Sequence, residues 1–361
     1  MFDIEELYGI EPFSLSKDEK EREMFNALSF LTKRHYKYCP EYKLMLDAMG
    51  FQLESMEKVS DVPFLPVRLF KEYSLRSVEK ENIQKTMTSS GTTGQRVSKI
   101  FLDKYTSTNQ TKTLSKIMTS YLGKKRLPML IIDSSAVLKD RNMFSARGAG
   151  ILGFSMYGYD QTYALDENMQ LRTDEIKKFL NKHKDEQILM FGFTFMIWQH
   201  FCQKMIEEHL EFDFSKGILI HGGGWKKLAE QAVSNNVFKK TLATSCGVKK
   251  VYNYYGMVEQ TGSIYMECEQ GHLHSSIYSD IIIRRSKDFS VADIGEDGIV
   301  QVVSVLPYSY PGHSLLTEDD GVLLGEDDCP CGRKGKYFNI HGRLKNAEIR
   351  GCSDTYAAKI K

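Results

Sequence analysis

The sequence has no apolar run long enough to cross a membrane and no large excess of charge of either sign. Its 361 residues contain 48 Lys and Arg against 47 Asp and Glu, a formal net charge of +1. A dedicated nucleic-acid-binding protein usually carries a basic excess or a basic stripe, so this balance argues against that class. No stretch approaches the roughly 18 consecutive apolar residues of a membrane-spanning helix, and we expect no membrane span.

Features of a secreted protein are also missing. The chain starts Met-Phe-Asp-Ile-Glu-Glu, which is acidic where a signal peptide is basic and then apolar. Seven cysteines are an odd number in a chain of this size, so a disulfide framework is not expected. Internal repeats and low-complexity linkers are absent. These absences favour a cytoplasmic globular protein. The size of the chain favours an enzyme, and the 42% of hydrophobic residues can form a full core.

The pattern of apolar residues changes twice along the chain. Residues 1–60 read as helical, with Ser16 and Glu19 spaced for a capping box at the start of a long helix. The middle of the chain alternates short apolar runs with helical segments, which indicates an α/β region with a parallel sheet. After residue 260 the sequence is β-rich. The predicted strands are 129–132, 187–191, 218–220, 251–255, 281–283 and 299–303.

A stretch of hydroxyl and glycine residues at 88–94 is the most informative motif. It reads Thr-Ser-Ser-Gly-Thr-Thr-Gly and is followed by Arg96 and Lys99. Glycine lets backbone N–H groups approach a phosphate, hydroxyls donate further hydrogen bonds, and cations balance the charge. A Walker loop is excluded because no Gly-Lys-Ser/Thr follows at the required spacing. The alternative is a polar turn without a ligand.

Two further turns follow predicted strands. His221-Gly-Gly-Gly-Trp225 comes after the strand at 218–220, and Tyr254-Tyr-Gly-Met-Val-Glu259 continues from the strand at 251–255. Ligands of open parallel sheets bind beyond the carboxyl ends of the strands, where both turns lie. Glycines there admit a flat ring or a phosphate, and a carboxylate such as Glu259 can hold Mg²⁺. Tight strand–helix turns also need glycine for purely steric reasons.

Together these motifs resemble the adenylate-forming enzymes from about residue 60 onward. The sequence is most similar to the phenylacetate–CoA ligases and to the LuxE acyl-protein synthetases of bacterial fatty-acid reductase complexes. The resemblance implies an α/β adenylate-forming (ANL-like) domain with parallel-sheet lobes and a β-rich C-terminal part. The motifs that carry it, in order, are 62–71, 89–94, 222–226, 255–259, 317–319 and 342–343.

The resemblance also implies a reaction and a role for each motif residue. A carboxylic acid, we expect a fatty acid, attacks the α-phosphate of ATP to give an acyl-adenylate and pyrophosphate. Glu259 is expected to coordinate Mg²⁺, Asp319 to accept from the ribose hydroxyls, and Arg343 to lie at the ribose and the hinge. Asp320 is the alternative to Asp319, and Val258 departs from the usual Thr. The expected phosphate-binding residues are Ser89, Ser90, Gly91, Thr92, Thr93 and Gly94, and the expected adenine-flanking residues are Gly222, Gly223, Gly224, Tyr254, Tyr255 and Gly256.

The C-terminal end departs from the wider superfamily, which usually continues for roughly 100 residues as a lid domain. Only 18 residues follow Arg343 here. We therefore expect a helical segment over 1–60, an adenylation domain over 61–343, and a short tail over 344–361 in place of the lid. LuxE proteins share this truncation and carry the acyl group on a cysteine near the C-terminus. Cys352 stands at that position, and the alternative is an incidental tail cysteine.

Four other residues have metal-ligand chemistry. Cys329 and Cys331 form a C-x-C pair, and Cys268 precedes two histidines, His272 and His274. Three thiolates and one imidazole make a closed tetrahedral structural zinc site. Similar positions in phenylacetate–CoA ligase relatives favour His274 over His272 as the fourth ligand. The alternative is a set of reduced thiols without metal.

The remaining cysteines and glycines are expected to be structural. Cys39, Cys202 and Cys246 are predicted to be buried fillers. The Gly148–Gly153 stretch matches G-x-G-x-x-G but lies too far from its strand for a dinucleotide site, so we expect a loop lining the acyl pocket. His35, in a charge-rich helical segment, is expected to be solvated or capping.

The sequence thus predicts an ATP- and Mg²⁺-dependent ligase with a structural Zn²⁺ that forms an acyl-adenylate and then a protein thioester at Cys352. The resemblance implies a LuxC-type reductase partner that receives the acyl group. A CoA ligase of the phenylacetate type and a non-catalytic nucleotide-binding subunit remain alternatives. The sequence does not determine the oligomeric state, so both a monomer and an oligomer stay open.

Overall fold

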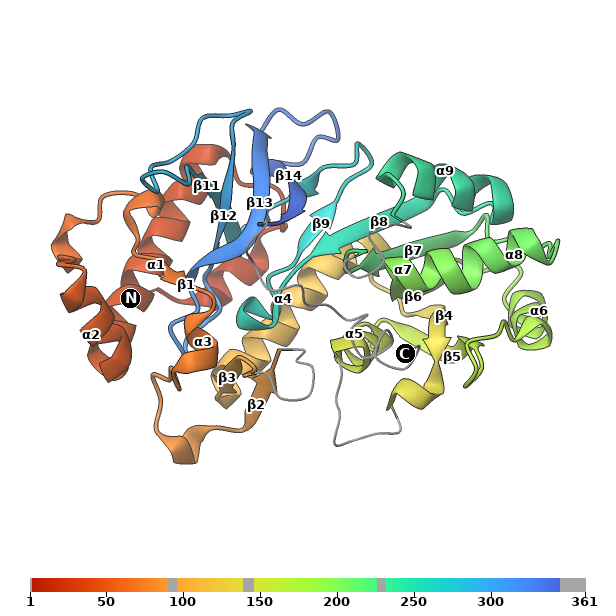
Figure 1. The fold of residues 1–361 in the computed structure, drawn as a ribbon, viewed down its shortest axis with the longest axis horizontal. Coiled ribbons are helices and arrows are strands. Elements are labelled where there is room, and N and C mark those ends of the chain that lie inside the picture. Colours follow the sequence, from red (N-terminus) through yellow and green to blue (C-terminus); the bar gives the residue numbers. More distant parts are fainter. Residues whose placement is uncertain (1, 90–95, 139–145, 226–231, 345–361) are drawn as a thin grey trace. The chain divides into compact units, whose positions relative to one another are not determined.

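The computed structural model describes residues 2–89, 96–138, 146–225 and 232–344 (Figure 1). These residues form two compact units, hereafter the first unit, residues 2–121 with 255–344, and the second unit, residues 122–254. The division predicted from the sequence, with boundaries near residues 60 and 343, stays a prediction. No helix of the described residues is long and apolar enough to cross a membrane.

A parallel sheet in the order β5-β4-β6-β7-β8 is the centre of the second unit (Figure 1). β4, β6 and β7 are buried along their whole lengths, as expected for strands of a parallel sheet covered on both faces. The four strands predicted in this region are confirmed. The sheet consists of β4 (Leu127–Ser134), β5 (Gly158–Leu165), β6 (Ile188–Phe193), β7 (Gly217–Gly222) and β8 (Lys250–Tyr255).

Helices pack on this sheet, and one of them corrects the sequence prediction. Gly148–Gly153 lies inside α5 (Ala146–Ser155) and is not a loop. Ile151 and Phe154 are buried at helical spacing, and a Cβ at Gly150 would lie 3.0 Å from the Phe193 ring. Gly150 therefore allows α5 to pack closely on the sheet. The other helices are η5 (Ser135–Leu138), α6 (Thr173–Lys182), α7 (Thr194–Met196), the π-helix Ile197–Cys202, α8 (Gln203–Glu207) and α9 (Asn235–Cys246).

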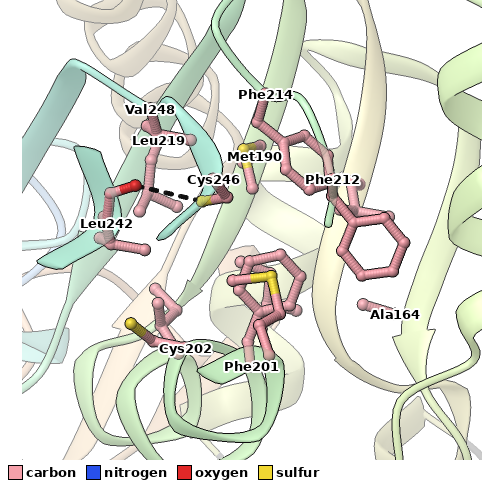
Figure 2. Packing of buried hydrophobic residues seen from close by; sticks show 14 of the residues in the cluster. Ala164, Met190, Phe201, Cys202, Phe212, Phe214, Leu219, Leu242, Cys246 and Val248 are labelled. Carbon is pink, nitrogen blue, oxygen red and sulfur yellow. Dashed lines mark hydrogen bonds between the residues drawn. The ribbon is translucent and has the colours of Figure 1, made fainter. Parts of the chain in front are cut away.

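The core of the second unit contains two of the predicted filler cysteines (Figure 2). Cys202 and Cys246 are 0% and 3% exposed among aromatic and aliphatic side chains. The Cys246 thiol donates to the Leu242 carbonyl oxygen over 3.3 Å, and burial raises the pKa of Cys246 to about 12. Both thiols are therefore neutral packing groups, which confirms the filler prediction. Cys39 is likewise buried in the core of the first unit.

A largely antiparallel sheet forms the centre of the first unit, in the order β11-β12-β13-β14-β10-β9. β1 (Leu65–Pro66) pairs in parallel with β13, and β2 (Lys85–Thr88) forms a separate hairpin with β3 (Lys99–Leu102). The β-rich character predicted after residue 260 is confirmed. The remaining strands are β9 (Tyr265–Glu267), β10 (Leu273–His274), β11 (Ser279–Arg284), β12 (Asp297–Ser304), β13 (Ser314–Glu326) and β14 (Lys336–Arg343).

The N-terminal residues of the first unit are helical, as predicted. Glu19 Oε2 accepts from the Ser16 backbone N–H over 3.0 Å and closes the expected capping box. His35 is not solvated: it is 0% exposed, with Nδ1 2.7 Å from Ser77 Oγ and Nε2 3.0 Å from the Pro307 carbonyl oxygen. The helices are η1 (Ile4–Gly9), α1 (Lys17–Tyr38), α2 (Pro40–Ala48), η2 (Leu53–Ser55), η3 (Val59–Asp61), α3 (Leu69–Glu72), η4 (Lys80–Asn82), α4 (Lys104–Leu122) and η8 (Val258–Gln260).

Candidate functional site

The hydroxyl-rich loop starts from the β2–β3 hairpin. The hairpin register pairs Thr88 with Lys99, and the next residue, Ser89, donates its backbone N–H to the Ser98 carbonyl oxygen over 3.2 Å. The Ser89 hydroxyl oxygen accepts from the Ser98 backbone N–H over 2.9 Å. Ser89 thus closes the neck of the loop. The other predicted phosphate-binding residues lie outside the described residues; they are Ser90, Gly91, Thr92, Thr93 and Gly94.

Glu259 lies in the short helix η8 and is 6% exposed. Burial raises the pKa of its carboxyl group, and the positive charges of Lys71 and Arg343 offset part of that rise. The backbone is fixed around it, because the Tyr310 hydroxyl donates to the Glu259 carbonyl oxygen over 2.8 Å. A bound cation would stabilise a buried carboxylate of this kind, because its positive charge offsets the cost of burying the negative charge.

Three further predicted residues of the first unit lie together. The Tyr255 hydroxyl donates to Asp319 Oδ2 over 2.7 Å, and Arg343 Nε lies 3.8 Å from Asp319 Oδ1. The β13–β14 register places Asp319 opposite Arg343 and Asp320 opposite Gly342. Because neighbouring residues of a strand point to opposite faces, Asp320 points away from Tyr255. This geometry favours Asp319 over Asp320 as the member of the site.

The predicted glycine turn lies at the end of β7 in the second unit. A side chain at Gly222 would overlap the Tyr254 ring, and a side chain at Gly223, with φ of +78°, would meet the Phe193 ring at 3.1 Å. Tyr254 in turn packs on Phe154, with ring centroids 5.2 Å apart. Gly224 follows and is exposed. Close packing therefore requires glycine at both positions, and at Gly223 the backbone conformation requires it as well.

A polar contact that the sequence reasoning missed supports this turn. Thr194, the first residue of α7, has its hydroxyl 2.9 Å from His221 Nδ1 and 3.2 Å from the Gly222 carbonyl oxygen. Burial lowers the pKa of His221 to about 3, so its ring is neutral. If Thr194 donates to the Gly222 carbonyl, His221 must donate to Thr194 from Nδ1. The residues are 27 positions apart, so no local motif could have indicated the contact.

The four predicted metal ligands form one cluster in the first unit. Cys268 follows β9, His274 lies in β10, and Cys329 and Cys331 flank the tight turn after β13. Their ligand atoms all lie within 4.8 Å of one another. Cys268 Sγ is 3.9 Å from Cys329 Sγ, and Cys331 Sγ is 3.4 Å from His274 Nε2. These are close to the edges of about 3.8 and 3.6 Å of a tetrahedron with Zn–S near 2.3 Å and Zn–N near 2.05 Å.

The protonation and surroundings of this cluster also fit a metal. Burial lowers the pKa of His274 to about 4, so its imidazole is neutral and able to bind a cation. Its ring stacks on Tyr337 with centroids 5.7 Å apart, which fixes its plane. His272 Nδ1 lies 3.5 Å from Cys329 Sγ but is not one of the four mutually close residues. The predicted choice of His274 over His272 agrees with this arrangement.

The predicted residues thus divide between the two units. The first unit holds Ser89, the three-residue group at Asp319, Gly256, Glu259 and the cysteine–histidine cluster, and the second holds Gly222, Gly223, Gly224 and Tyr254. Cys352 lies outside the described residues. Support residues such as Tyr310 and Thr194 were not found from the sequence, because their partners are far away in the chain.

Solved structures resemble this fold over most of the chain. An open conformation of 2-hydroxyisobutyryl-CoA ligase matches with a TM-score of 0.69 at 15% identity, covering 94% of this chain and 78% of that one. The same enzyme in its postadenylation state covers 92% and 69%, again with a TM-score of 0.69 and 15% identity. The predicted adenylate-forming fold is therefore confirmed.

Relatives with similar sequences have one shared description. The long-chain-fatty-acid–luciferin-component ligase of Vibrio harveyi is 20% identical over 331 residues, which cover 88% of this chain and 83% of the relative. The protein of the same description from Aliivibrio fischeri is 22% identical over 317 residues, covering 85% and 81%. The model of the family described as acyl-protein synthetase, LuxE, matches residues 3–361. The chain therefore belongs to the LuxE acyl-protein synthetase family.

Proposed function

We propose that this chain activates a fatty acid with ATP and then passes the acyl group to a cysteine thiol, from which a reductase takes it. A carboxylate oxygen of the acid bonds to the α-phosphorus of ATP, and the bond from that phosphorus to pyrophosphate breaks. The thiolate, having lost its proton to solvent, then bonds to the acyl carbon while AMP leaves. The observation that carries this proposal is the match to the acyl-protein synthetase family over residues 3–361.

Asp319 and Arg343 are the residues we assign to the ribose. The Tyr255 hydroxyl donates a hydrogen bond to Asp319 Oδ2 and so orients the carboxylate. Asp319 Oδ1 is 3.8 Å from Arg343 Nε, beyond hydrogen-bond distance, so we assign this oxygen to the ribose hydroxyls. Arg343, one-third exposed, then contributes positive charge near the nucleotide. This arrangement supplies positioning and charge balance, which is what attack at phosphorus requires.

Glu259 is the residue we assign to Mg²⁺. Its carboxyl group has a raised pKa caused by burial, so it fits a site that a divalent cation completes. When bound, the cation would neutralise charge on the ATP phosphates. The loop that begins at Ser89 would bind the phosphates through backbone N–H groups and hydroxyls, and Ser89 itself holds the loop neck closed.

The glycine turn and the two tyrosines are assigned to adenine. Gly222 and Gly223 leave no room for side chains, and Tyr254 packs on Gly222 and Phe154. A flat purine can approach backbone that carries no side chains, and Tyr254 and Tyr255 are the last residues of the neighbouring strand β8, which Gly256 follows.

Cys352 is the acyl acceptor that we propose. A thiolate is a good nucleophile toward the mixed anhydride of an acyl-adenylate, and the thioester product keeps the acyl group activated. Cys352 stands nine positions after Arg343, and a chain of that length can extend over roughly 30 Å, so the tail has the reach for this transfer. The receiving reductase would be a LuxC-type protein.

The cysteine–histidine cluster is proposed to bind a structural zinc ion. Three thiolates and one imidazole at near-tetrahedral spacing supply all four ligands. With no ligand position left for water or substrate, the ion would fix the turn at 329–331 to the β9–β10 hairpin and would have no part in the chemistry.

Pyrophosphate release with a panel of carboxylic acids tests the first step. We expect release that depends on ATP, Mg²⁺ and a long-chain fatty acid, and release with no acid of the panel would contradict the proposal. A CoA ligase is the second candidate, because the structure of 2-hydroxyisobutyryl-CoA ligase has a similar fold. Formation of acyl-CoA when CoA is added, with no acyl group bound to protein, would favour that candidate instead.

A further inference from the structure

A groove outside the candidate site runs along helix α1. It has a volume of about 690 Å³ and lies among the N-terminal residues before and within η1, helix α1, and the segment at η2. This volume is in the range of cavities that bury a ligand or several side chains. All the lining residues belong to the first unit.

Four large apolar side chains line the groove and are partly exposed. They are Phe25 and Phe30 of α1, Phe2 before η1 and Leu53 of η2, and none of them is fully buried. These four side chains form an apolar surface that is partly open to water. A partner that covers this surface would be stabilised by the contact. Burial of their apolar area against a partner is favourable.

One polar atom in the groove also lacks a partner within the described part of the chain. The Ser29 hydroxyl oxygen is buried but makes no hydrogen bond there. Thr32, less than one turn further along α1, donates to the carbonyl oxygen of Leu28 over 2.8 Å, so the helix itself can satisfy such a hydroxyl. A buried hydroxyl without a hydrogen-bond partner costs free energy, so this part of α1 is less stable than it could be.

The charged residues that line the groove are mostly acidic. They are Asp3, Glu6, Glu23 and Glu54, against the single ammonium group of Lys33. Arg22 pairs with Glu23 over 3.3 Å. The four acidic residues still outnumber Lys33 and Arg22 together, so the groove remains negative. This charge disfavours fatty acids, nucleotides, CoA and anionic membranes, all of which are negative. The groove is therefore unsuited to the substrates of the proposed reaction.

We propose that this groove binds a basic amphipathic helix of the protein that receives the acyl group. Apolar residues on one side of such a helix would cover Phe25 and Phe30, and flanking Lys or Arg would meet Glu6 and Glu54. The groove is bounded by helical elements, so a helix can pack into it by ridges and grooves, and no strand edge there offers β-pairing. This inference rests on the proposed function only in taking the partner to be the acyl-receiving protein.

A synthetic probe tests the groove directly. The probe is a fluorescent peptide of about 15 residues with leucines at helical spacing and lysines beside them. Its matched control has glutamate in place of each lysine. We expect fluorescence anisotropy to show binding of the lysine peptide that weakens with added salt, and no binding of the glutamate peptide.

Paired charge reversals then locate the binding. The variant Glu6→Lys/Glu54→Lys should weaken binding of the lysine peptide at least about tenfold, which corresponds to about 1.4 kcal/mol. The control Glu208→Lys/Glu211→Lys changes the net charge equally on exposed residues of the second unit and should leave binding unchanged. Absence of peptide binding, equal binding of both peptides, or equal loss in both variants would overturn the inference.

Pyrophosphate release by the same variants separates this inference from the proposed function. We expect release to be unchanged in both charge-reversed proteins, because none of the four residues belongs to the candidate active site. Loss of peptide binding with normal release supports the groove as a docking surface. The wild-type protein could also bind the peptide in the groove but release no pyrophosphate with any acid. That result would support the docking surface and overturn the proposed function alone.

Discussion

The hydroxyl of Tyr255 donates a hydrogen bond of 2.7 Å to Asp319 Oδ2, joining two residues that stand 64 positions apart in the sequence. Asp319 in turn lies beside Arg343 on the neighbouring strand. Desolvation and the adjacent Asp319 carboxylate raise the pKa of Tyr255 well above its usual value, so the phenol keeps its proton and donates. The contact therefore holds Asp319 in one orientation.

Tyr255→Phe should raise the KM for ATP in pyrophosphate release while changing kcat little. A hydrogen bond to a charged group contributes about 1.5–3 kcal/mol, so we expect a rise of about tenfold or more. Asp319→Asn should have a similar effect, and Asp320→Asn is the matched control. Equal effects of the two asparagine variants would contradict the assignment of Asp319 to the ribose.

Thr194→Val should weaken nucleotide use because it removes the hydroxyl between His221 and the Gly222 carbonyl without changing the shape of the side chain much. We expect a KM for ATP several-fold higher, as loss of about 1 kcal/mol implies. Thr194→Ser keeps the hydroxyl and should restore the KM. Equal KM values for the Val and Ser variants, at equal melting temperatures, would show that the hydroxyl does not act on the turn.

Glu259→Gln should separate stability from catalysis. Burial raises the pKa of Glu259, so the ionised carboxylate destabilises the protein without cations as pH rises through that pKa. The variant should therefore melt no lower than the wild type at pH 8 and should release far less pyrophosphate. Stabilisation of the wild type by Mg²⁺ and ATP should increase with pH over the same range, and the variant should lack that increase. Wild-type activity in the variant would contradict a role for Glu259 in binding Mg²⁺.

Cys331→Ser tests the zinc proposal. We expect about one zinc ion per purified chain and its loss in the variant, with a lower melting temperature because the metal holds the turn at 329–331 in place. Cys246→Ser also removes a thiol, but one in the core of the second unit, and should keep the zinc. A wild-type protein without zinc, as measured by elemental analysis, would show that the cluster is a set of reduced thiols.

The central strands were predictable because burial on both faces leaves a continuous apolar run, as in β4, β6 and β7. β5 was missed because it pairs only with β4 at the sheet edge and its middle residues are polar and partly exposed. α5 was predicted as a loop because its glycines suggested one, although one of them, Gly150, allows close packing against Phe193.

The candidate site was predictable in composition but not in its supporting contacts. The cysteine–histidine cluster could be anticipated because metal-ligand chemistry limits which residue types can serve. Tyr310 beside Glu259 and Thr194 beside His221 could not, because tertiary folding alone brings them together. His35 was misjudged for the same reason: its helix looks charged, but Ser77 and Pro307 satisfy its ring inside the core.

The most direct test of the account is the covalent fate of a labelled fatty acid incubated with this protein and ATP. The account predicts label on the protein that survives denaturing electrophoresis, is released by hydroxylamine, and disappears in Cys352→Ser while pyrophosphate release remains. Cys39→Ser is the matched control and should keep the label. Undiminished hydroxylamine-sensitive label in Cys352→Ser would contradict Cys352 as the acceptor, and absence of any protein-bound label in the wild type would contradict the acyl-protein thioester itself.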